Sequence, residues 1–402
     1  MSLPKEQVVS LIVSQLKQFG YYTAAKQIGD SIGLQPEPSN KLNELLSKSD
    51  IALDDSYTEL VQVPEFVDDV GHLVFEQEKL KSNNIPYQPW FTTQHRGSCR
   101  ASAFSLDGNY LATGSSDTSL KVLDTQLIVK YHGESSEEKK VFKTLYDHTE
   151  AVNETVFHPN GAVLASCADD FNIKFFDLQK QNSKRAFRYL PDSYPVRSIS
   201  FHPSGEFIIS GTDHHAVRLF DIQTMKVFIP SNASEHHQAG ITKVRYASNG
   251  NMFASCSIDG SIKLYDTVTS RCVNTINNAH DGASIIGIQF SKSCAYLLST
   301  GLDGKGKLWD MSSGNVLCTY EGALQRFDHA PMSFTYNEDF VVGTDASNHS
   351  ICIWDSQTGE IVKRIRGVHD SPIRTISCSP VDQSFVTGGE DCRARFWNYS
   401  TQ

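Results

Sequence analysis

The stretch ASCSIDGSIKLYD at residues 254–266 shows the pattern that decides the fold. Small residues lead into a turn that contains an aspartate, alternating residues follow, and an aromatic residue and a second aspartate close the unit. Ile262 and Leu264 alternate with polar residues at a period of two, which is typical of a β-strand and not of a helix. The stretch therefore predicts two strands joined by a tight turn.

Six further stretches repeat this pattern. They read ATGSSDTSLKVLD at 112–124, ASCADDFNIKFFD at 165–177, ISGTDHHAVRLFD at 209–221, LSTGLDGKGKLWD at 298–310, VVGTDASNHSICIWD at 341–355 and VTGGEDCRARFWN at 386–398. The closing residues of the seven units are 53, 44, 45, 44, 45 and 43 residues apart. This period is typical of WD40 blades with four strands each. The sequence therefore predicts a mainly β fold, a seven-bladed WD40 β-propeller.

The last unit lacks one strand. Its closing Asn398 stands four residues before the end of the sequence, whereas a further strand follows each of the other units. The segment YQPWFTT at 87–93 is aromatic and β-prone and precedes the first unit. We expect this segment to close the seventh blade as its outer strand, because closure removes an exposed sheet edge. The propeller should then span residues 87–402.

A histidine stands 22 or 23 residues before the turn aspartate in five units. The spacing resembles the structural hydrogen-bond tetrad of WD40 proteins, which joins a His, a Ser or Thr, an Asp and a Trp. Two sets are complete, namely His280, Ser299, Asp303 and Trp309 in the fifth blade and His369, Thr387, Asp391 and Trp397 in the seventh. Five near-identical copies cannot all be Ser-His-Asp active sites, and buried polar groups must be paired. We therefore expect structural tetrads and no catalytic residues.

Two blades depart from the pattern. His214 stands where the third blade should have its turn aspartate, and the sixth unit is two residues longer than the others. We expect these two blades to be locally looser.

The N-terminal residues 5–33 predict two amphipathic helices broken at Gly20, because apolar residues recur at spacings of three and four. The apolar positions are Val8, Leu11, Ile12, Leu16, Phe19, Tyr22, Ala25 and Ile28. Leu-Ile-x-x-x-Leu followed by Gly-Tyr resembles the LisH dimerisation motif. Small helices in residues 1–50 bury too little surface to be stable alone, and self-association is the usual remedy. We expect a homodimerisation domain; the alternative is that these helices pack onto the side of the propeller.

Charge is distributed unevenly along the chain. The formal net charge is −10, and residues 1–90 hold 13 acidic and 7 basic side chains. Residues 51–86 are acidic and lack periodicity, which predicts an acidic linker. The net charge argues against a surface built to grip a phosphate backbone, although the nearly balanced propeller leaves room for local basic patches.

No metal, cofactor or membrane segment is expected. The nine cysteines are scattered without Cys-x-x-Cys spacing. The pairs His214–His215 and His236–His237 do not predict a metal site, because adjacent residues point to opposite faces of a strand. The sequence contains no P-loop, no dinucleotide-binding glycine pattern and no stretch of about 18 apolar residues that would span a membrane.

Five stretches outside the repeat pattern resemble one family, the 50-kDa WD40 subunit of cleavage stimulation factor. They are KTLYDH at 143–148, SKRAFRY at 183–189, RSISFHPSGEF at 197–207, AHDGA at 279–283 and DCRARFW at 391–397. The resemblance implies a non-catalytic scaffold in the nucleus that acts in pre-mRNA 3′-end cleavage and polyadenylation.

The resemblance also implies partners. In that family the N-terminal domain homodimerises and the propeller binds the HAT-repeat subunit, through which it joins the RNA-recognition-motif subunit. The RNA polymerase II C-terminal domain is a further candidate partner. Direct sequence-specific RNA binding is not expected, because another subunit reads the RNA. The alternative function is a WD40 substrate receptor of a ubiquitin ligase, which also couples LisH-like helices to a propeller.

Three arginines open predicted inner strands near the mouth of the central channel, namely Arg100, Arg197 and Arg374. Arginine pairs bidentately with carboxylate and phosphate, so this group predicts a site for an acidic or phosphorylated peptide. The alternative is that they pair with local carboxylates such as Asp107 or Asp382. The basic group Lys184, Arg185 and Arg188 is expected on a solvated outer strand between the second and third blades.

Overall fold

The computed structural model describes residues 87–131, 139–180, 183–230, 232–324, 331–346 and 348–399. The expectations for residues 1–86, which are the helices, the dimerisation residues from Val8 to Ile28 and the acidic linker, lie outside the described residues. All described residues belong to one compact unit, Lys81–Gln402.

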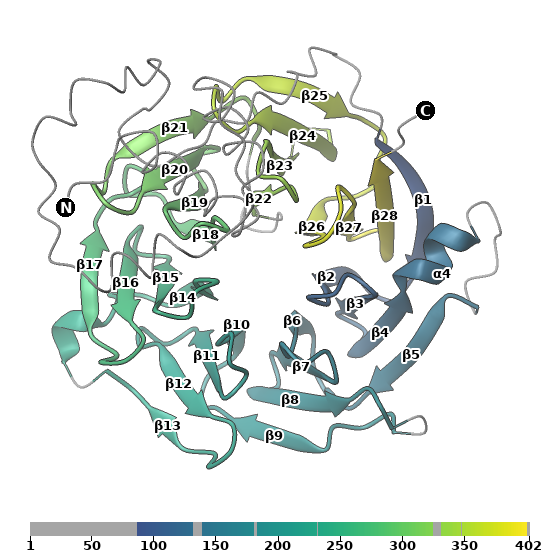
Figure 1. Ribbon diagram of the computed structural model, residues 1–402, viewed down its shortest axis with the longest axis horizontal. Coiled ribbons are helices and arrows are strands. Elements are labelled where there is room, and N and C mark those ends of the chain that lie inside the picture. The colour runs from purple at the N-terminus through teal and green to yellow at the C-terminus, as the bar shows by residue number, and fades with distance from the viewer. Residues whose placement is uncertain are drawn as a thin grey trace, which may run out of the picture. The chain divides into compact units, whose positions relative to one another are not determined.

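Seven four-stranded antiparallel sheets surround a common centre as the blades of a propeller (Figure 1). The first blade consists of β2 (Cys99–Phe104), β3 (Tyr110–Ser115), β4 (Ser119–Asp124) and β5 (Val141–Tyr146). The second consists of β6 (Val152–Phe157), β7 (Val163–Ala168), β8 (Asn172–Asp177) and β9 (Arg188–Pro191). The third consists of β10 (Val196–Phe201), β11 (Phe207–Thr212), β12 (Arg218–Asp221) and β13 (Val227–Phe228). The expected seven-bladed fold is confirmed.

The remaining blades follow in chain order. The fourth consists of β14 (Ile241–Tyr246), β15 (Met252–Ser257), β16 (Ile262–Asp266) and β17 (Cys272–Ile276). The fifth consists of β18 (Ile285–Phe290), β19 (Tyr296–Gly301), β20 (Gly306–Asp310) and β21 (Val316–Tyr320). The sixth consists of β22 (Ser333–Phe334), β23 (Phe340–Asp345), β24 (Ser350–Asp355) and β25 (Ile361–Ile365). The seventh consists of β26 (Ile373–Cys378), β27 (Phe385–Gly389), β28 (Arg393–Tyr399) and β1 (Tyr87–Gln94).

The seventh blade joins the two ends of the propeller sequence. β1 pairs antiparallel with β28, with Tyr87 opposite Tyr399 and Gln94 opposite Arg393. The Tyr87 ring meets the Phe385 ring edge-on at 4.9 Å between centroids, which fixes β1 to the core of the blade. The segment expected at 87–93 therefore lies in β1 and covers the edge of β28.

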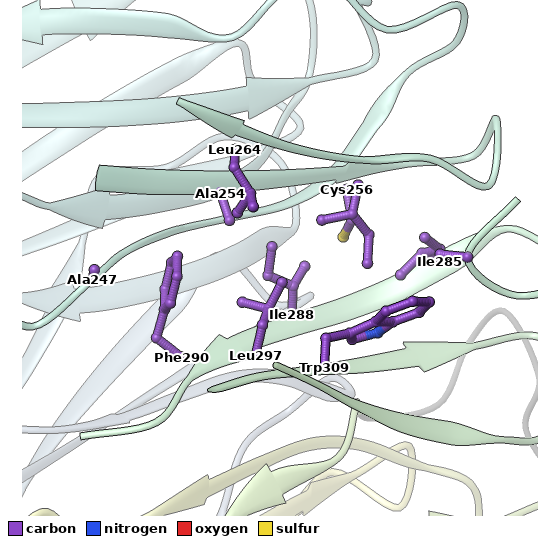
Figure 2. Close-up of a cluster of buried hydrophobic side chains, with 11 residues drawn as sticks. Ala247, Ala254, Cys256, Leu264, Ile285, Ile288, Phe290, Leu297 and Trp309 are labelled. Carbon is purple, nitrogen blue, oxygen red and sulfur yellow. The ribbon is translucent and has the colours of Figure 1, made fainter. Parts of the chain in front are cut away.

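The core lies between neighbouring blades. Apolar side chains that alternate along the strands of one blade face those of the next, as Figure 2 shows for the fourth and fifth blades. Leu264 from β16 packs there with Ile285 from β18 and Trp309 from β20, and all three are buried. Because each blade buries apolar surface against both neighbours, the ring stabilises every blade in it.

A short helix between β4 and β5 is a feature that the sequence patterns did not predict. α4 (Thr125–Lys130) begins at Asp124, whose carboxylate accepts a hydrogen bond from the Leu127 backbone at 3.0 Å. Lys140, directly before β5, is buried with its ammonium 4.7 Å from the Phe91 ring centre. The other described helix is η2 (Ala233–Glu235). Neither described helix is long and apolar enough to cross a membrane.

Candidate functional site

In the fifth blade the structure brings the four expected tetrad residues together in one hydrogen-bonded chain. His280 Nδ1 lies 3.0 Å from the Asp303 carboxylate, and His280 Nε2 lies 2.7 Å from the Ser299 hydroxyl. The indole N–H of Trp309 donates to the same hydroxyl at 2.8 Å. Because Ser299 accepts from Trp309 and bonds to the ring of His280, its hydroxyl is fully engaged inside the blade.

The seventh blade repeats this arrangement. His369 contacts Asp391 and Thr387 at 2.9 Å each, and Trp397 donates to Thr387 at 3.0 Å. Thr387 is completely buried, as is Ser299 in the fifth blade. A substrate therefore has no access to either hydroxyl, and the geometry favours a structural role.

Other blades contain related hydrogen bonds at the corresponding positions. His148 bonds to Asp170 at 2.8 Å and to Ser166 at 2.7 Å. In the third blade His214 accepts the Ala216 N–H at 3.2 Å, as a turn aspartate does in the first, second, fourth, fifth and seventh blades. Burial lowers the pKa of His280, and its Asp303 partner offsets this only in part.

A central cavity of about 410 Å³ is lined by the innermost strands of six blades and holds more basic than acidic side chains. Among the described lining residues five are basic, namely Arg100, Lys243, Arg245, Lys292 and Arg374, and two are acidic, namely Glu154 and Glu338. The chain as a whole carries a net charge of −10, so this concave surface differs in sign from the rest of the molecule. Charge concentrated in a concave site attracts ligands of the opposite sign.

Glu154 is the acidic centre of this lining. Its carboxylate accepts from Arg245 at 2.5 Å and from Lys243 at 2.7 Å, and the Ser198 hydroxyl donates to it at 2.6 Å. Burial alone would raise the pKa of Glu154, but the two cations beside it lower that pKa to about 2. One carboxylate between two cations leaves a positive excess. Glu154, Lys243 and Arg245 were not predicted as site residues. The sequence signal that could have identified them is the presence of charged residues inside segments that are otherwise β-prone.

The three predicted arginines lie near the channel, but each is paired. Arg197 binds Asp213 in a bidentate pair at 2.7 Å and also reaches Asp169 at 2.8 Å. Arg100 lies 3.7 Å from Asp169, and its buried Nε has no hydrogen-bond partner. Arg374 pairs with Glu390.

Asp107 and Asp382, which the sequence suggested as carboxylate partners of the three arginines, do not pair with them. Asp107 bonds Ser105 at 2.5 Å in its own turn, and Asp382 bonds Ser384. The true partners come from turns that follow the second strand of a blade. Of the three arginines, Arg100 and Arg374 line the cavity.

The prediction that the paired histidines lie on a strand and point to opposite faces was also wrong. His214 and His215 lie in the turn between β11 and β12, not on a strand, and their ring centroids are 3.9 Å apart. The His236 ring lies 5.4 Å from that of His215. Within the described ranges, no group of three or more His, Cys, Asp or Glu side chains could hold a metal ion.

Comparison with known proteins agrees with this geometry. The WD40 repeat model ("WD domain, G-beta repeat") matches residues 88–124, 139–177, 187–221, 230–266, 270–310 and 360–398. The chain is 34% identical to cleavage stimulation factor subunit 50 of Arabidopsis thaliana over 80% of its own length and 76% of that protein. This chain belongs to the WD40 family of cleavage stimulation factor subunit 50. Most of the sixth blade falls outside the matched ranges, and its sequence departs most from the repeat.

More distant relatives share the repeat architecture with the subunit 50 family. The COMPASS component SWD3 of Saccharomyces cerevisiae is 24% identical over 62% of this chain and 83% of its own. The nuclear distribution protein PAC1 of Coccidioides posadasii is 26% identical over 94% of this chain and 75% of its own. The crystal structure of the Cps50 (Swd1) β-propeller domain of Myceliophteria thermophila superposes with a TM-score of 0.67 at 18% identity, covering 79% of this chain and 100% of that domain. That likeness shows the fold alone.

Proposed function

We propose that this chain is a non-catalytic scaffold subunit of a cleavage stimulation complex and acts in the nucleus in pre-mRNA 3′-end cleavage and polyadenylation. The observation that carries the proposal is the relationship to cleavage stimulation factor subunit 50, which extends over 80% of the chain. The family membership suggests an interaction role. The burial of Ser299 and Thr387 supports a role without catalysis, because the hydroxyls nearest to a histidine serve the blade itself.

Three parts of the chain have different roles in this proposal. Residues 1–50 form a LisH-like homodimerisation domain through Val8, Leu11, Ile12, Leu16, Phe19, Tyr22, Ala25 and Ile28. Residues 51–86 act as an acidic linker. The propeller binds the HAT-repeat subunit and through it joins the RNA-recognition-motif subunit.

The basic channel is the part of the propeller best suited to an acidic or phosphorylated segment of a partner. The Arg100 side chain is 34% exposed and makes only a long contact to Asp169, 3.7 Å, so its guanidinium is open to pairing with a ligand carboxylate or phosphate. Arg374 lines the same cavity, and Arg197 stands beside it through the shared Asp169. The phosphorylated RNA polymerase II C-terminal domain is a candidate ligand of this chemistry.

The test replaces Arg100 and Arg374 with glutamine, which removes the charge without repelling Asp169 or Glu390. The double variant should bind recombinant HAT-repeat subunit or a phosphorylated C-terminal domain peptide at least tenfold more weakly, as for other charged interface pairs. The matched control is Lys305→Gln, which removes an exposed cation paired with Glu321 at the fifth blade. Unchanged affinity for both ligands at a native melting temperature would refute the channel as the binding site.

A further inference from the structure

A second basic surface lies on the outer rim of the propeller, away from the channel lining. We define the rim belt as Lys184, Arg185, Phe187, Arg188 and Tyr189, in and just before β9, the outermost strand of the second blade. All five are exposed, and the two aromatic side chains are 53% and 62% accessible. Exposed rings of this size on an edge strand mark an interaction surface.

The rim belt continues onto both neighbouring blades. The backbone N–H of Tyr146, at the end of β5, donates to the Lys184 carbonyl at 3.0 Å, and the Tyr146 side chain is 54% exposed. On the other side Arg188 Nη1 donates to the Ile222 carbonyl of the third blade at 2.7 Å. Beyond it Phe228 of β13 is 47% exposed. Figure 1 shows β5, β9 and β13 following one another around the rim.

The cations of the rim belt differ from those of the channel. Lys184, Arg185 and Arg188 form no ion pair with a carboxylate of the described residues, whereas Arg197 and Arg374 at the channel are both paired. Three unneutralised cations on a chain of net charge −10 make a local positive surface that is open to solvent. A polyanion would gain contacts there without displacing an internal carboxylate.

The aromatic residues decide which polyanion fits. Phe187 lies in the bend directly before β9 and Tyr189 is the second residue of β9, so two exposed rings stand close together along the chain. Neither ring contacts another ring among the described residues. Exposed rings between backbone-tracking cations are the stacking platforms of single-strand binding proteins. An acidic peptide would use the cations but would leave the ring faces without partners.

We propose that the rim belt binds single-stranded RNA without sequence preference. The bases stack on Phe187 and Tyr189, and the phosphates pair with Lys184 and Arg185, whereas Arg188 faces the third blade and adds only to the local positive charge. This binding needs no partner subunit, so its test is independent of the assembly proposed above. It also agrees with the expectation that another subunit reads the sequence.

The test measures binding of labelled oligouridylate to the full chain by fluorescence anisotropy at several salt concentrations. Two phosphate contacts predict a slope of log affinity against log salt of about −1.4, since each contact on a single strand contributes about −0.7. Phe187→Ala with Tyr189→Ala should weaken binding at least about tenfold, because two stacking contacts are lost. Lys184→Gln with Arg185→Gln should make the slope shallower by about 1.4.

Matched controls lie on other outer strands. Val273 on β17 and Leu317 on β21 are 66% and 55% exposed, and Arg271 is an exposed cation beside β17. Val273→Ala, Leu317→Ala and Arg271→Gln should leave RNA affinity within twofold of that of the unchanged chain. All variants should keep the native melting temperature, because every substituted side chain is exposed.

Three outcomes would overturn the proposal. The first is no measurable RNA binding by the unchanged chain at low salt. The second is an equal loss in rim-belt and control variants. The third is equally tight binding of an oligoglutamate of matched charge that does not respond to Phe187→Ala with Tyr189→Ala, because the rim belt would then be a site for an acidic protein segment.

Discussion

Asp391 holds the His369 ring through contacts of 2.9 Å, while the other ring nitrogen of His369 bonds to the buried Thr387. Asp391→Ala leaves the ring without its carboxylate partner inside the blade. Since an unsatisfied buried polar group costs about 1–3 kcal/mol, we expect the free energy of unfolding to fall by about 2 kcal/mol in urea titrations. The control is Asp370→Ala, which removes an 82% exposed carboxylate beside the same histidine. Equal stability of both variants would show that the tetrad does not support the blade.

Titration of buried groups predicts how stability depends on pH. Burial lowers the pKa of His237 and His280, despite the aspartate beside each ring, so the unfolded chain binds protons first as pH falls below about 6.5. The melting temperature should therefore drop between pH 7 and 5.

A second loss of stability follows at lower pH. Although burial opposes it, the His148 contact lowers the pKa of Asp170 to about 2, and Arg245 and Lys243 do the same for Glu154. These depressed carboxyl pKa values contribute stability that is lost as pH falls from about 4 toward 2. Scanning calorimetry across pH 7.5 to 2 checks both steps, and a constant melting temperature down to pH 5 would contradict the histidine assignment.

β1 is the element on which closure of the ring depends. A chain that begins at residue 87 keeps Tyr87 and Phe91 in the core, whereas one that begins at residue 95 loses both and exposes the edge of β28. Burying each aromatic side chain contributes about 1.5–3 kcal/mol, so the shorter chain should be less stable by about 3–6 kcal/mol and should aggregate. Thermal unfolding with light scattering compares the two, and equal melting temperatures would show that β1 does not close the ring.

The strands could be predicted from sequence because their pattern is local and repeated. The two-residue alternation in ASCSIDGSIKLYD depends only on neighbouring residues. The period of the seven units is visible because the same pattern recurs along the chain. β1 could be placed because the last unit lacks a strand and the segment at 87–93 is β-prone. α4 was missed because it is six residues long and depends on one N-cap at Asp124.

Arg197–Asp213 and Arg374–Glu390 pair within one blade, but the other charge pairs could not be predicted because they cross from blade to blade. Arg197 of the third blade pairs with Asp169 of the second blade. Arg245 of the fourth blade pairs with Glu154 of the second blade at the channel lining. No sequence spacing encodes these contacts. The cluster of His214, His215 and His236 was misjudged for a related reason, since a turn was treated as a strand.

The propeller combines a ring of blades that stabilise one another with two basic surfaces, one in the channel and one on the rim. Radial stacking leaves the innermost and outermost strands available for partners, because the apolar faces are used between blades. A scaffold that displays separate surfaces can hold several partners at once.

The N-terminal domain should add self-association to this scaffold. We expect the full chain to sediment as a dimer in analytical ultracentrifugation and a chain of residues 51–402 as a monomer. Leu11→Asp with Leu16→Asp should also give a monomer, because charges on the apolar helix face oppose its burial. A dimer of the shortened chain would place self-association in the rest of the chain.

The proposed function is tested most directly by affinity purification of the full chain from nuclear extract, followed by mass spectrometry. We expect the HAT-repeat and RNA-recognition-motif subunits of cleavage stimulation factor to copurify, and Arg100→Gln with Arg374→Gln to reduce their recovery. Recovery of ubiquitin-ligase adaptors in the absence of those subunits would contradict the account and make the chain a substrate receptor.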